Sequence, residues 1–237
     1  MDTIVDFFLE PYYNASALNI VLEFIAACFG IISVIYAKKE NILVYPTGII
    51  STGLYVYLLS QWALYGDLII NIYYTLMSLY GWYMWTRVSE KSHKTIQITS
   101  VNSLDKLKAF TIFAFTAIFV IVVYRYYEVM PDLNLMESVD YAFQKLSSGN
   151  LIEFRKATPY LDTFTTAAAF VAMWLMANKK IENWIFWIIT NIVSIPLYFV
   201  KGYGFTGIQY IIFLGLAFLG YKEWKKSLNK QNQTVLK

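Results

Sequence analysis

Two tryptophans and an asparagine in one apolar stretch are the residues of this sequence best suited to hold a ligand. Trp184, Trp187 and Asn191 recur at positions i, i+3 and i+7, which places them on one face of a helix. Tryptophan faces bind flat rings, and cationic rings best, while an amide both donates and accepts hydrogen bonds. This face therefore suits a small aromatic nucleoside or a heteroaromatic cation.

Two further apolar stretches carry amides and hydroxyls at helical spacing. Asn71 and Thr75 lie four positions apart in the stretch 67–86, and Gln209 lies in the stretch 205–222. Because a polar group in lipid needs a partner or a ligand, we expect these side chains to converge on one site. The expected substrate-binding residues are Trp184, Trp187, Asn191, Asn71, Thr75, Gln209, Trp82 and Ser194.

Each of these residues also has a purely structural interpretation. Trp82 and Trp184 lie near the ends of their stretches, where tryptophan often belongs to the aromatic belt at a membrane surface. The three amides could hydrogen-bond neighbouring helices, and small hydroxyls commonly pack between helices in membranes.

The elements that position these residues are predicted to cross a membrane. The chain is 58% hydrophobic and 15% charged, whereas a soluble domain carries about 25% charged residues. Seven apolar segments are each about long enough to span a hydrocarbon core of roughly 30 Å. They cover residues 18–37, 42–60, 67–86, 108–127, 159–177, 183–200 and 205–222. The predicted fold is therefore an all-α integral membrane protein with seven transmembrane helices.

The residues that most enzymes and metal proteins need are scarce. The single cysteine, Cys28, lies inside an apolar run, and the single histidine, His93, lies in a polar loop. Neither has a partner for a metal site or a catalytic pair, and no phosphate-binding loop of the P-loop type occurs. We expect no catalytic residue, no metal, no cofactor and no enzyme activity. The basic residues form no stripe for nucleic acid.

Loop charges predict the orientation in the membrane. Sorting the 19 Lys and Arg residues by the side that their loops would occupy puts 14 on the side of the C-terminus and 5 on the other. Positive charge favours the cytoplasm, so residues 1–17 are expected outside and residues 225–237 inside, as a tail without regular structure.

Charge inside the segments is rare. Glu23 and Asp162 begin the first and fifth segments, near the expected outer face, where they could be solvated, pair with loop cations or gate an entrance. The absence of a mid-depth Lys or Arg argues against a phosphorylated substrate. It also leaves proton or sodium coupling without a carrier, which favours an uncoupled facilitator.

The two ends of the chain resemble each other. Residues 18–86 and 159–224 form two three-helix units, and the linker 87–158 holds the fourth membrane helix and a loop suited to a short surface helix. Asn71 is expected opposite Gln209, Gly48 opposite Asn191, and the run 80–85 opposite 219–224. The odd helix between the copies gives them the same orientation, and substrate is expected between the halves.

The string Glu182-Asn183-Trp184-Ile185-Phe186-Trp187-Ile188-Ile189-Thr190-Asn191 resembles the Trp-x-x-Trp-x-x-x-Asn signature of the PnuC family of bacterial nicotinamide riboside transporters. Tyr80-Gly81-Trp82-Tyr83-Met84-Trp85 resembles that family's motif on the third core helix. The resemblance covers about residues 18–226. Asn71 departs from the family pattern, which often has Gln there.

This resemblance implies a three-plus-one-plus-three fold like that of the SWEET sugar transporters, located in the bacterial inner membrane. It implies facilitated diffusion of nicotinamide riboside, with uptake driven by a cytoplasmic kinase that phosphorylates the substrate, and a homotrimer. It also implies that Trp184, Trp187 and Asn191 hold the ligand. A thiamine or riboflavin carrier of the same fold, and a SWEET-type sugar carrier, are the alternatives.

Overall fold

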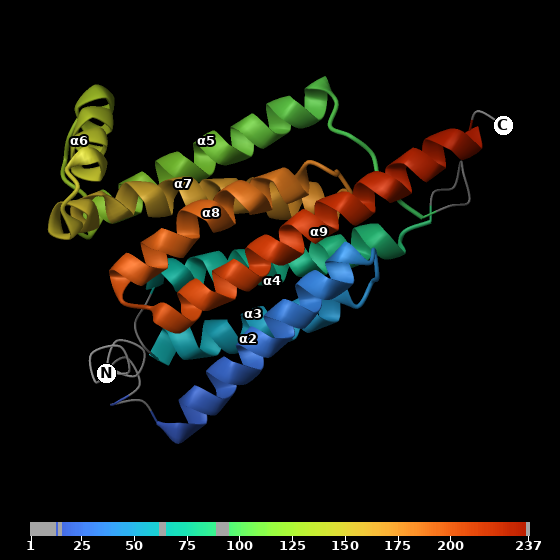
Figure 1. Ribbon diagram of the computed structural model, residues 1–237, viewed down its shortest axis with the longest axis horizontal. Coiled ribbons are helices and arrows are strands. Elements are labelled where there is room, and N and C mark those ends of the chain that lie inside the picture. The colour runs from blue at the N-terminus through green and yellow to red at the C-terminus, as the bar shows by residue number, and fades with distance from the viewer. Residues whose placement is uncertain (1–12, 14–15, 62–64, 89–94, 236–237) are drawn as a thin grey trace.

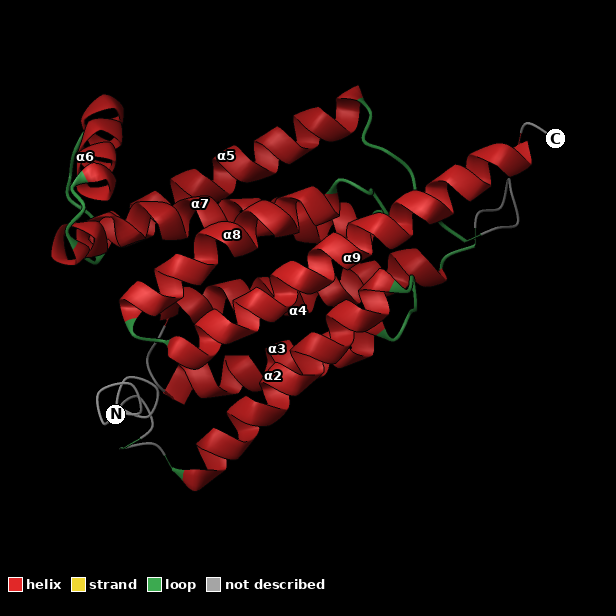
Figure 2. Cartoon of the chain, in the orientation of Figure 1, coloured by secondary structure: helices red, strands yellow, loops and turns green. Residues whose placement is uncertain are grey.

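The computed structural model describes residues 13, 16–61, 65–88 and 95–235, and His93 lies outside this range. The described part of the chain forms eight helices and no extended sheet (Figures 1 and 2). These helices are α2 (Ala17–Lys38), α3 (Val44–Gln61), α4 (Tyr65–Thr86), α5 (Ser103–Tyr126), α6 (Leu135–Ser147), α7 (Leu151–Ala177), α8 (Asn183–Lys201) and α9 (Gly204–Val235).

Every predicted apolar segment corresponds to one long helix, and the surface helix expected in the linker is α6. Five of the helices, α2, α5, α7, α8 and α9, are long and apolar enough to cross a membrane by length and composition. The sequences of α3 and α4 are rich in tyrosine and hydroxyl residues, which lower their hydropathy.

Side-chain caps define where several helices begin. Asn102 and Asp105 form a reciprocal capping box at the start of α5, and Asn134 and Glu137 form another at α6. Such caps satisfy backbone N–H groups that have no partner within the helix. Gly202, with φ of 89°, ends α8 in the left-handed conformation, which costs glycine little and allows the short turn into α9.

The six helices outside the linker pack as a ring. Within the first unit α3 contacts α2 and α4, and within the second α8 contacts α7 and α9. Contacts of α4 with α7 and of α2 with α9 join the units, while α5 and α6 lie outside the ring against α7. Figure 1 shows α2 and α7 running in the same direction along the bundle, as do α4 and α9.

The two units match at a constant separation of 139 positions. This separation relates Val44 at the start of α3 to Asn183 at the start of α8, and Tyr65 at the start of α4 to Gly204 at the start of α9. The run 80–85 then matches 219–224, as predicted. The other two predicted pairs differ from this register, because Asn71 corresponds to Tyr210 and Gly48 to Trp187.

The end of the chain corrects another expectation. Residues 225–235 were predicted to lack regular structure, yet α9 continues to Val235, so that prediction was wrong. The segment holds three Lys, two Gln and one Leu, and these residues favour helix. Trp224 also anchors the helix just before this segment, because its indole N–H donates a hydrogen bond of 2.9 Å to the carbonyl of Ala37.

Candidate functional site

Side chains from helices that are not neighbours in the ring meet in its interior. Tyr74 of α4 and Trp187 of α8 lie with ring centres 6.3 Å apart and an interplanar angle of 63°, although α4 and α8 are not neighbours in the ring. Because α4 belongs to the first unit and α8 to the second, Tyr74 and Trp187 face the space between the two units.

Further aromatic pairs surround this centre. Tyr198 and Tyr210 stack with ring centres 4.9 Å apart, and Phe170 of α7 stacks on Tyr73 at 3.5 Å. The hydroxyl of Tyr73 also donates to the carbonyl of Phe170 over 2.9 Å, which fixes α4 against α7. The interior is thus lined by rings from four helices, α4, α7, α8 and α9, and suits a flat ligand.

Polar groups on α8 accompany Trp187. Asn191 and Ser194 continue its face at four and seven positions further on and are 3% and 2% exposed. The Asn191 side chain makes no hydrogen bond within the described residues, and neither does the buried hydroxyl of Thr190. Buried polar groups usually have partners, so the Asn191 amide is available to a ligand or to water.

The expected polar face of α4 is directed at α3 rather than at the ring interior. The Thr75 hydroxyl pairs with that of Thr52 at 2.7 Å, and the Asn71 amide donates to the carbonyl of Asp67 in its own helix over 2.9 Å. Tyr74, which the sequence analysis did not select, occupies the inner face instead. Gln209 lies at the contact of α9 with α2, where its amide is 3.7 Å from the position of a Cβ on Gly30.

The other two tryptophan candidates, Trp184 and Trp82, have different surroundings from Trp187. Trp184 is 1% exposed and packs edge-on against Trp224 with ring centres 5.7 Å apart, so it belongs to the core at that end of the bundle. Its indole N–H has no partner within the described residues. Trp82 is 40% exposed and is not brought together with the other candidates.

Matching contacts join the two units at the end where α4 and α9 carry these tryptophans. The indole of Trp85 donates to the carbonyl of Met176 over 3.3 Å, and that of Trp224 donates to Ala37 over 2.9 Å. Both the donors and the acceptors are 139 positions apart (85 and 224, 37 and 176). The two units are therefore fastened by one pseudo-symmetric pair of bonds.

An ion pair lies at the same end. Lys179 and Glu40, also 139 positions apart, approach to 3.6 Å, and the ammonium lies 4.5 Å from the centre of the Trp85 ring. Burial lowers the pKa of Lys179, and Glu40 partly opposes that shift. Both residues have positive φ, 53° for Glu40 and 48° for Lys179, so equivalent turns present them.

Charged groups at the other end are largely paired. Lys201 contacts the Asp162 carboxylate at 2.6 Å and lies 5.6 Å from the centre of the Tyr198 ring. Of the roles considered for Asp162, the structure places it in an ion pair. Asp67 lies at the start of α4.

A ring of long apolar helices around an aromatic, amide-bearing interior defines a multi-pass membrane transporter. The chain belongs to the nicotinamide mononucleotide transporter family, whose model matches residues 20–226.

Individual relatives agree with this assignment. The chain is 24% identical over 218 residues to the nicotinamide riboside transporter PnuC of Escherichia coli (strain K12), covering 91% of this chain and 89% of that protein. It is 31% identical over 78 residues to the riboflavin/roseoflavin transporter RibM of Streptomyces davaonensis, covering 33% of this chain and 37% of that protein. The crystal structure of the vitamin B3 transporter PnuC has a similar fold, with a TM-score of 0.61 and 24% identity, over 88% of this chain and 82% of that one.

Proposed function

We propose that the protein carries nicotinamide riboside across the bacterial inner membrane by facilitated diffusion. The observation that carries this proposal is the meeting of Trp187 and Tyr74 across the ring, with Asn191 and Ser194 on the face of Trp187. Aromatic faces suit the cationic pyridine ring, and the amide and hydroxyl suit the ribose hydroxyls. Trp184 supports this site from the packed end of α8.

An unphosphorylated substrate fits the charges of the interior better than a mononucleotide. A phosphate is held best by Arg or Lys in charge-assisted hydrogen bonds. Lys201, whose ammonium lies 5.6 Å from the centre of the Tyr198 ring, is already paired with Asp162. When both carboxyl groups are ionised, Asp67 and Asp162 would also attract a cationic ring and repel a phosphate.

The absence of charged residues from the proposed site supports transport without ion coupling. The residues of the proposed site, Trp187, Tyr74, Asn191 and Ser194, carry no charge at neutral pH, so the site itself offers no group to carry a proton or sodium ion through the cycle. Net uptake would then come from a cytoplasmic kinase that phosphorylates the substrate and prevents its return. This proposal assigns no enzyme activity to the chain itself.

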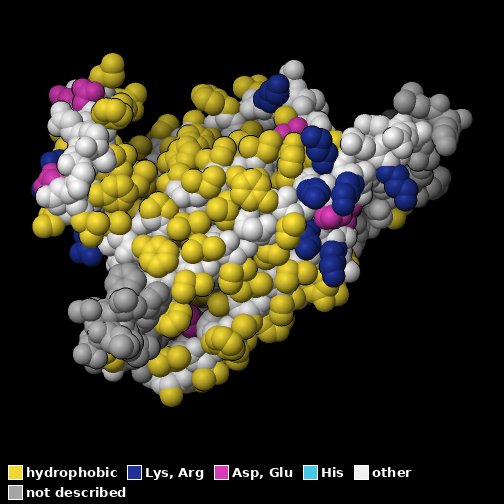
Figure 3. Space-filling model, in the orientation of Figure 1, with side chains coloured by type: hydrophobic (Ala, Val, Ile, Leu, Met, Phe, Trp, Pro, Cys, Tyr) yellow, Lys and Arg dark blue, Asp and Glu magenta, His cyan; other side chains and the backbone are white. Residues whose placement is uncertain are grey.

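The proposed topology has seven membrane helices in a three-plus-one-plus-three order, with α5 between the two parallel units and the N-terminus outside. Figure 3 supports it, because most visible Lys and Arg side chains gather at the end of the bundle opposite α6, and positive charge favours the cytoplasm. The homotrimer implied by the family resemblance is part of the proposal and is tested by cross-linking in the membrane.

Calorimetric titration of the purified protein with nicotinamide riboside, nicotinamide mononucleotide, thiamine, riboflavin and glucose tests the proposed substrate. We expect binding of nicotinamide riboside that is weakened in Trp187→Ala and unchanged in Trp82→Ala, the same substitution at an exposed position. Preference for thiamine or riboflavin would keep the site and change the cargo. Preference for the mononucleotide would contradict the charge argument.

Equilibrium uptake into vesicles tests the mechanism. Without a kinase, nicotinamide riboside should reach the same concentration on both sides, whether or not a proton or sodium gradient is applied. Accumulation driven by either gradient would rule out facilitated diffusion.

A further inference from the structure

Helix α6 lies across the bundle instead of along it. In Figure 1 the ring helices and α5 run roughly parallel, whereas α6 stands nearly crosswise at the end of α5. In a membrane crossed by the bundle, this orientation places α6 close to the plane of the surface.

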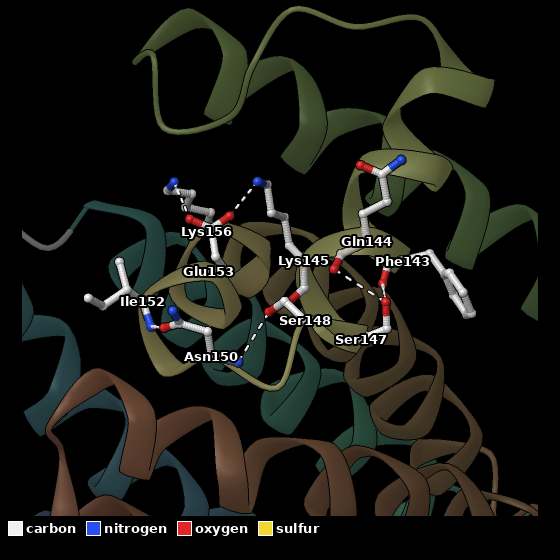
Figure 4. Close-up of polar contacts among 9 residues, drawn as sticks. All are labelled: Phe143, Gln144, Lys145, Ser147, Ser148, Asn150, Ile152, Glu153 and Lys156. Atoms are coloured by element: carbon white, nitrogen blue, oxygen red, sulfur yellow. Dashed lines mark hydrogen bonds and ion pairs between the residues drawn. The ribbon is translucent and has the colours of Figure 1, made fainter.

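The position of α6 is held by polar contacts at both of its ends. Before α6, the Arg125 guanidinium binds the carbonyl of Leu133 and lies 3.4 Å from the Asp132 carboxylate. At its end, Lys145 forms an ion pair with Glu153 at the start of α7, as Figure 4 shows. The helix is thus attached to α5 and α7 in a defined orientation.

One side of α6 faces the rest of the protein. Ser138 is buried beside Arg125, and Tyr141 packs near Tyr160 of α7 with ring centres 6.0 Å apart. At about 100° per residue, Lys145 falls on the same side. Ser138, Tyr141 and Lys145 fall within about 60° of one another around the helix.

A second side is apolar and uncovered. Leu135, Met136, Val139 and Phe143 are each between 57% and 79% exposed and fall within about 100° of one another around the helix. Figure 4 shows Phe143 pointing away from the Lys145 side. A long exposed apolar stripe of this kind marks a binding surface.

The third side is polar, with Glu137, Asp140 and Gln144 exposed. Figure 3 shows acidic atoms and hydrophobic atoms on different sides of α6, with hydrophobic atoms on the side turned toward the length of the bundle. The separation of an apolar side from a polar side is typical of a helix that lies in a membrane interface.

The surroundings of α6 identify lipid as the occupant of the apolar side. The outward side of α5 is itself strongly apolar, with Phe115, Ile118 and Val122 between 59% and 73% exposed, as lipid-facing residues are. Tyr126 and Tyr127, 80% and 64% exposed, follow at the end of α5, and tyrosine is enriched where a membrane meets water. The apolar side of α6 thus continues a membrane-facing surface.

We propose that α6 is an interfacial helix that inserts Leu135, Met136, Val139 and Phe143 into the outer lipid leaflet and exposes Glu137 and Asp140 to water. It braces α5 and α7 at the bilayer surface. The choice of the outer leaflet rests on the proposed topology, whereas the position of α6 in the interface does not.

Spin labels on the full-length protein test this placement. In a Cys28→Ala background, single cysteines replace Val139 or Phe143 on the apolar side and Asp140 or Gln144 on the polar side. The labelled proteins are placed in phosphatidylethanolamine and phosphatidylglycerol vesicles, and Phe115→Cys on α5 serves as the lipid-exposed reference. Collision rates are measured with oxygen, which concentrates in lipid, and with a water-soluble nickel chelate.

We expect labels at Val139 and Phe143 to match the Phe115 reference, with frequent oxygen and rare nickel collisions, and labels at Asp140 and Gln144 to show the reverse. Frequent nickel collisions at all four positions would overturn the proposal, because α6 would then stand in water. Exclusion of both reagents from Val139 and Phe143 would also overturn it, because a second copy or another protein would then cover the apolar side. All four positions are exposed, so labelling does not disturb a packed core.

Discussion

The two three-helix units close the ring with the same contacts but fill its centre with different side chains. At the end where α4 and α9 carry their tryptophans, Tyr45 packs edge-on against Trp85 with ring centres 5.2 Å apart, as Trp184 packs against Trp224 at 5.7 Å. Further along α3 and α8 the match ends, because Gly48 and Thr52 stand where the second unit has Trp187 and Asn191.

This difference has a physical consequence for each unit. A Cβ on Gly48 would lie 3.1 Å from the hydroxyl of Ser33 and 3.5 Å from that of Ser78, so α3 packs closely on its neighbours and offers no ring to a ligand. Small residues of this kind let membrane helices approach. In the first unit α3 therefore serves as part of the packed frame and only α4 contributes a ring, that of Tyr74, to the site. In the second unit α8, the counterpart of α3, presents the aromatic and amide groups.

The largest effect is expected from Gly81→Ala and Gly220→Ala, because these changes disturb the packing of a glycine against an aromatic ring that both units share. Their Cβ atoms would lie 2.3 Å and 2.5 Å from the rings of Tyr45 and Trp184, which are 1% exposed and have no room to move. Each change should destabilise the fold by about 1–3 kcal/mol or more. Thermal unfolding in detergent measures this, with Gly53→Ala and Gly215→Ala as controls because nothing lies within 4 Å of their Cβ positions. Equal losses in all four variants would contradict the shared packing.

The next largest effect is expected at Trp187, which stands in the second unit where the first unit has Gly48. Trp187→Ala removes one aromatic wall of the site, and a cation–ring contact is worth roughly 0.5–2 kcal/mol. The dissociation constant for nicotinamide riboside should rise by a factor of about 2 to 30, with little change in the unfolding temperature because Trp187 is only partly buried. Titration and thermal unfolding of the same preparation check the two parts. Unchanged affinity would remove Trp187 from the site.

A smaller effect is expected at the equivalent positions Asn191 and Thr52. Asn191→Ala should weaken ligand binding by about 0.5–1.5 kcal/mol, the net value of one hydrogen bond. Thr52→Ala should leave binding unchanged, because its hydroxyl is already paired with Thr75. Equal losses in both variants would mean that the two units share the ligand symmetrically.

The smallest effect concerns the ion pair between Glu40 and Lys179. This partly exposed pair is worth about 0–1 kcal/mol, so Glu40→Gln should modestly increase the access of water-soluble reagents to the interior from that end. Glu223→Gln is the control, because its pair with Lys226 joins residues of one helix. Since burial lowers the pKa of Lys179, the pair is complete below that lowered pKa and is lost as the pH rises through it. Access should therefore increase with pH in the wild type and less so in Glu40→Gln.

The sequence by itself determined where the seven long helices lie, except for the continuation of α9 to Val235. Runs of apolar residues near the thickness of a bilayer predicted all seven long helices, because backbone groups in lipid must be satisfied within the helix. The paired Gly and Trp motifs at 81 and 220, and at 85 and 224, revealed the repeat. The spacing of Trp187, Asn191 and Ser194 correctly placed them on one face of α8.

Only the tertiary structure decided which face of each helix looks into the ring. Asn71 and Thr75 share a face, but helical spacing cannot say that this face meets α3, and membrane helices are apolar on most sides, so polarity gives little contrast. The predicted pairing of Gly48 with Asn191 was four residues away from the observed pairing of Gly48 with Trp187. Four residues are about one helical turn, so this shift returns each residue to nearly the same face of its helix. Packing resolved both points, because Tyr45 fits only against Gly81 and Trp184 only against Gly220.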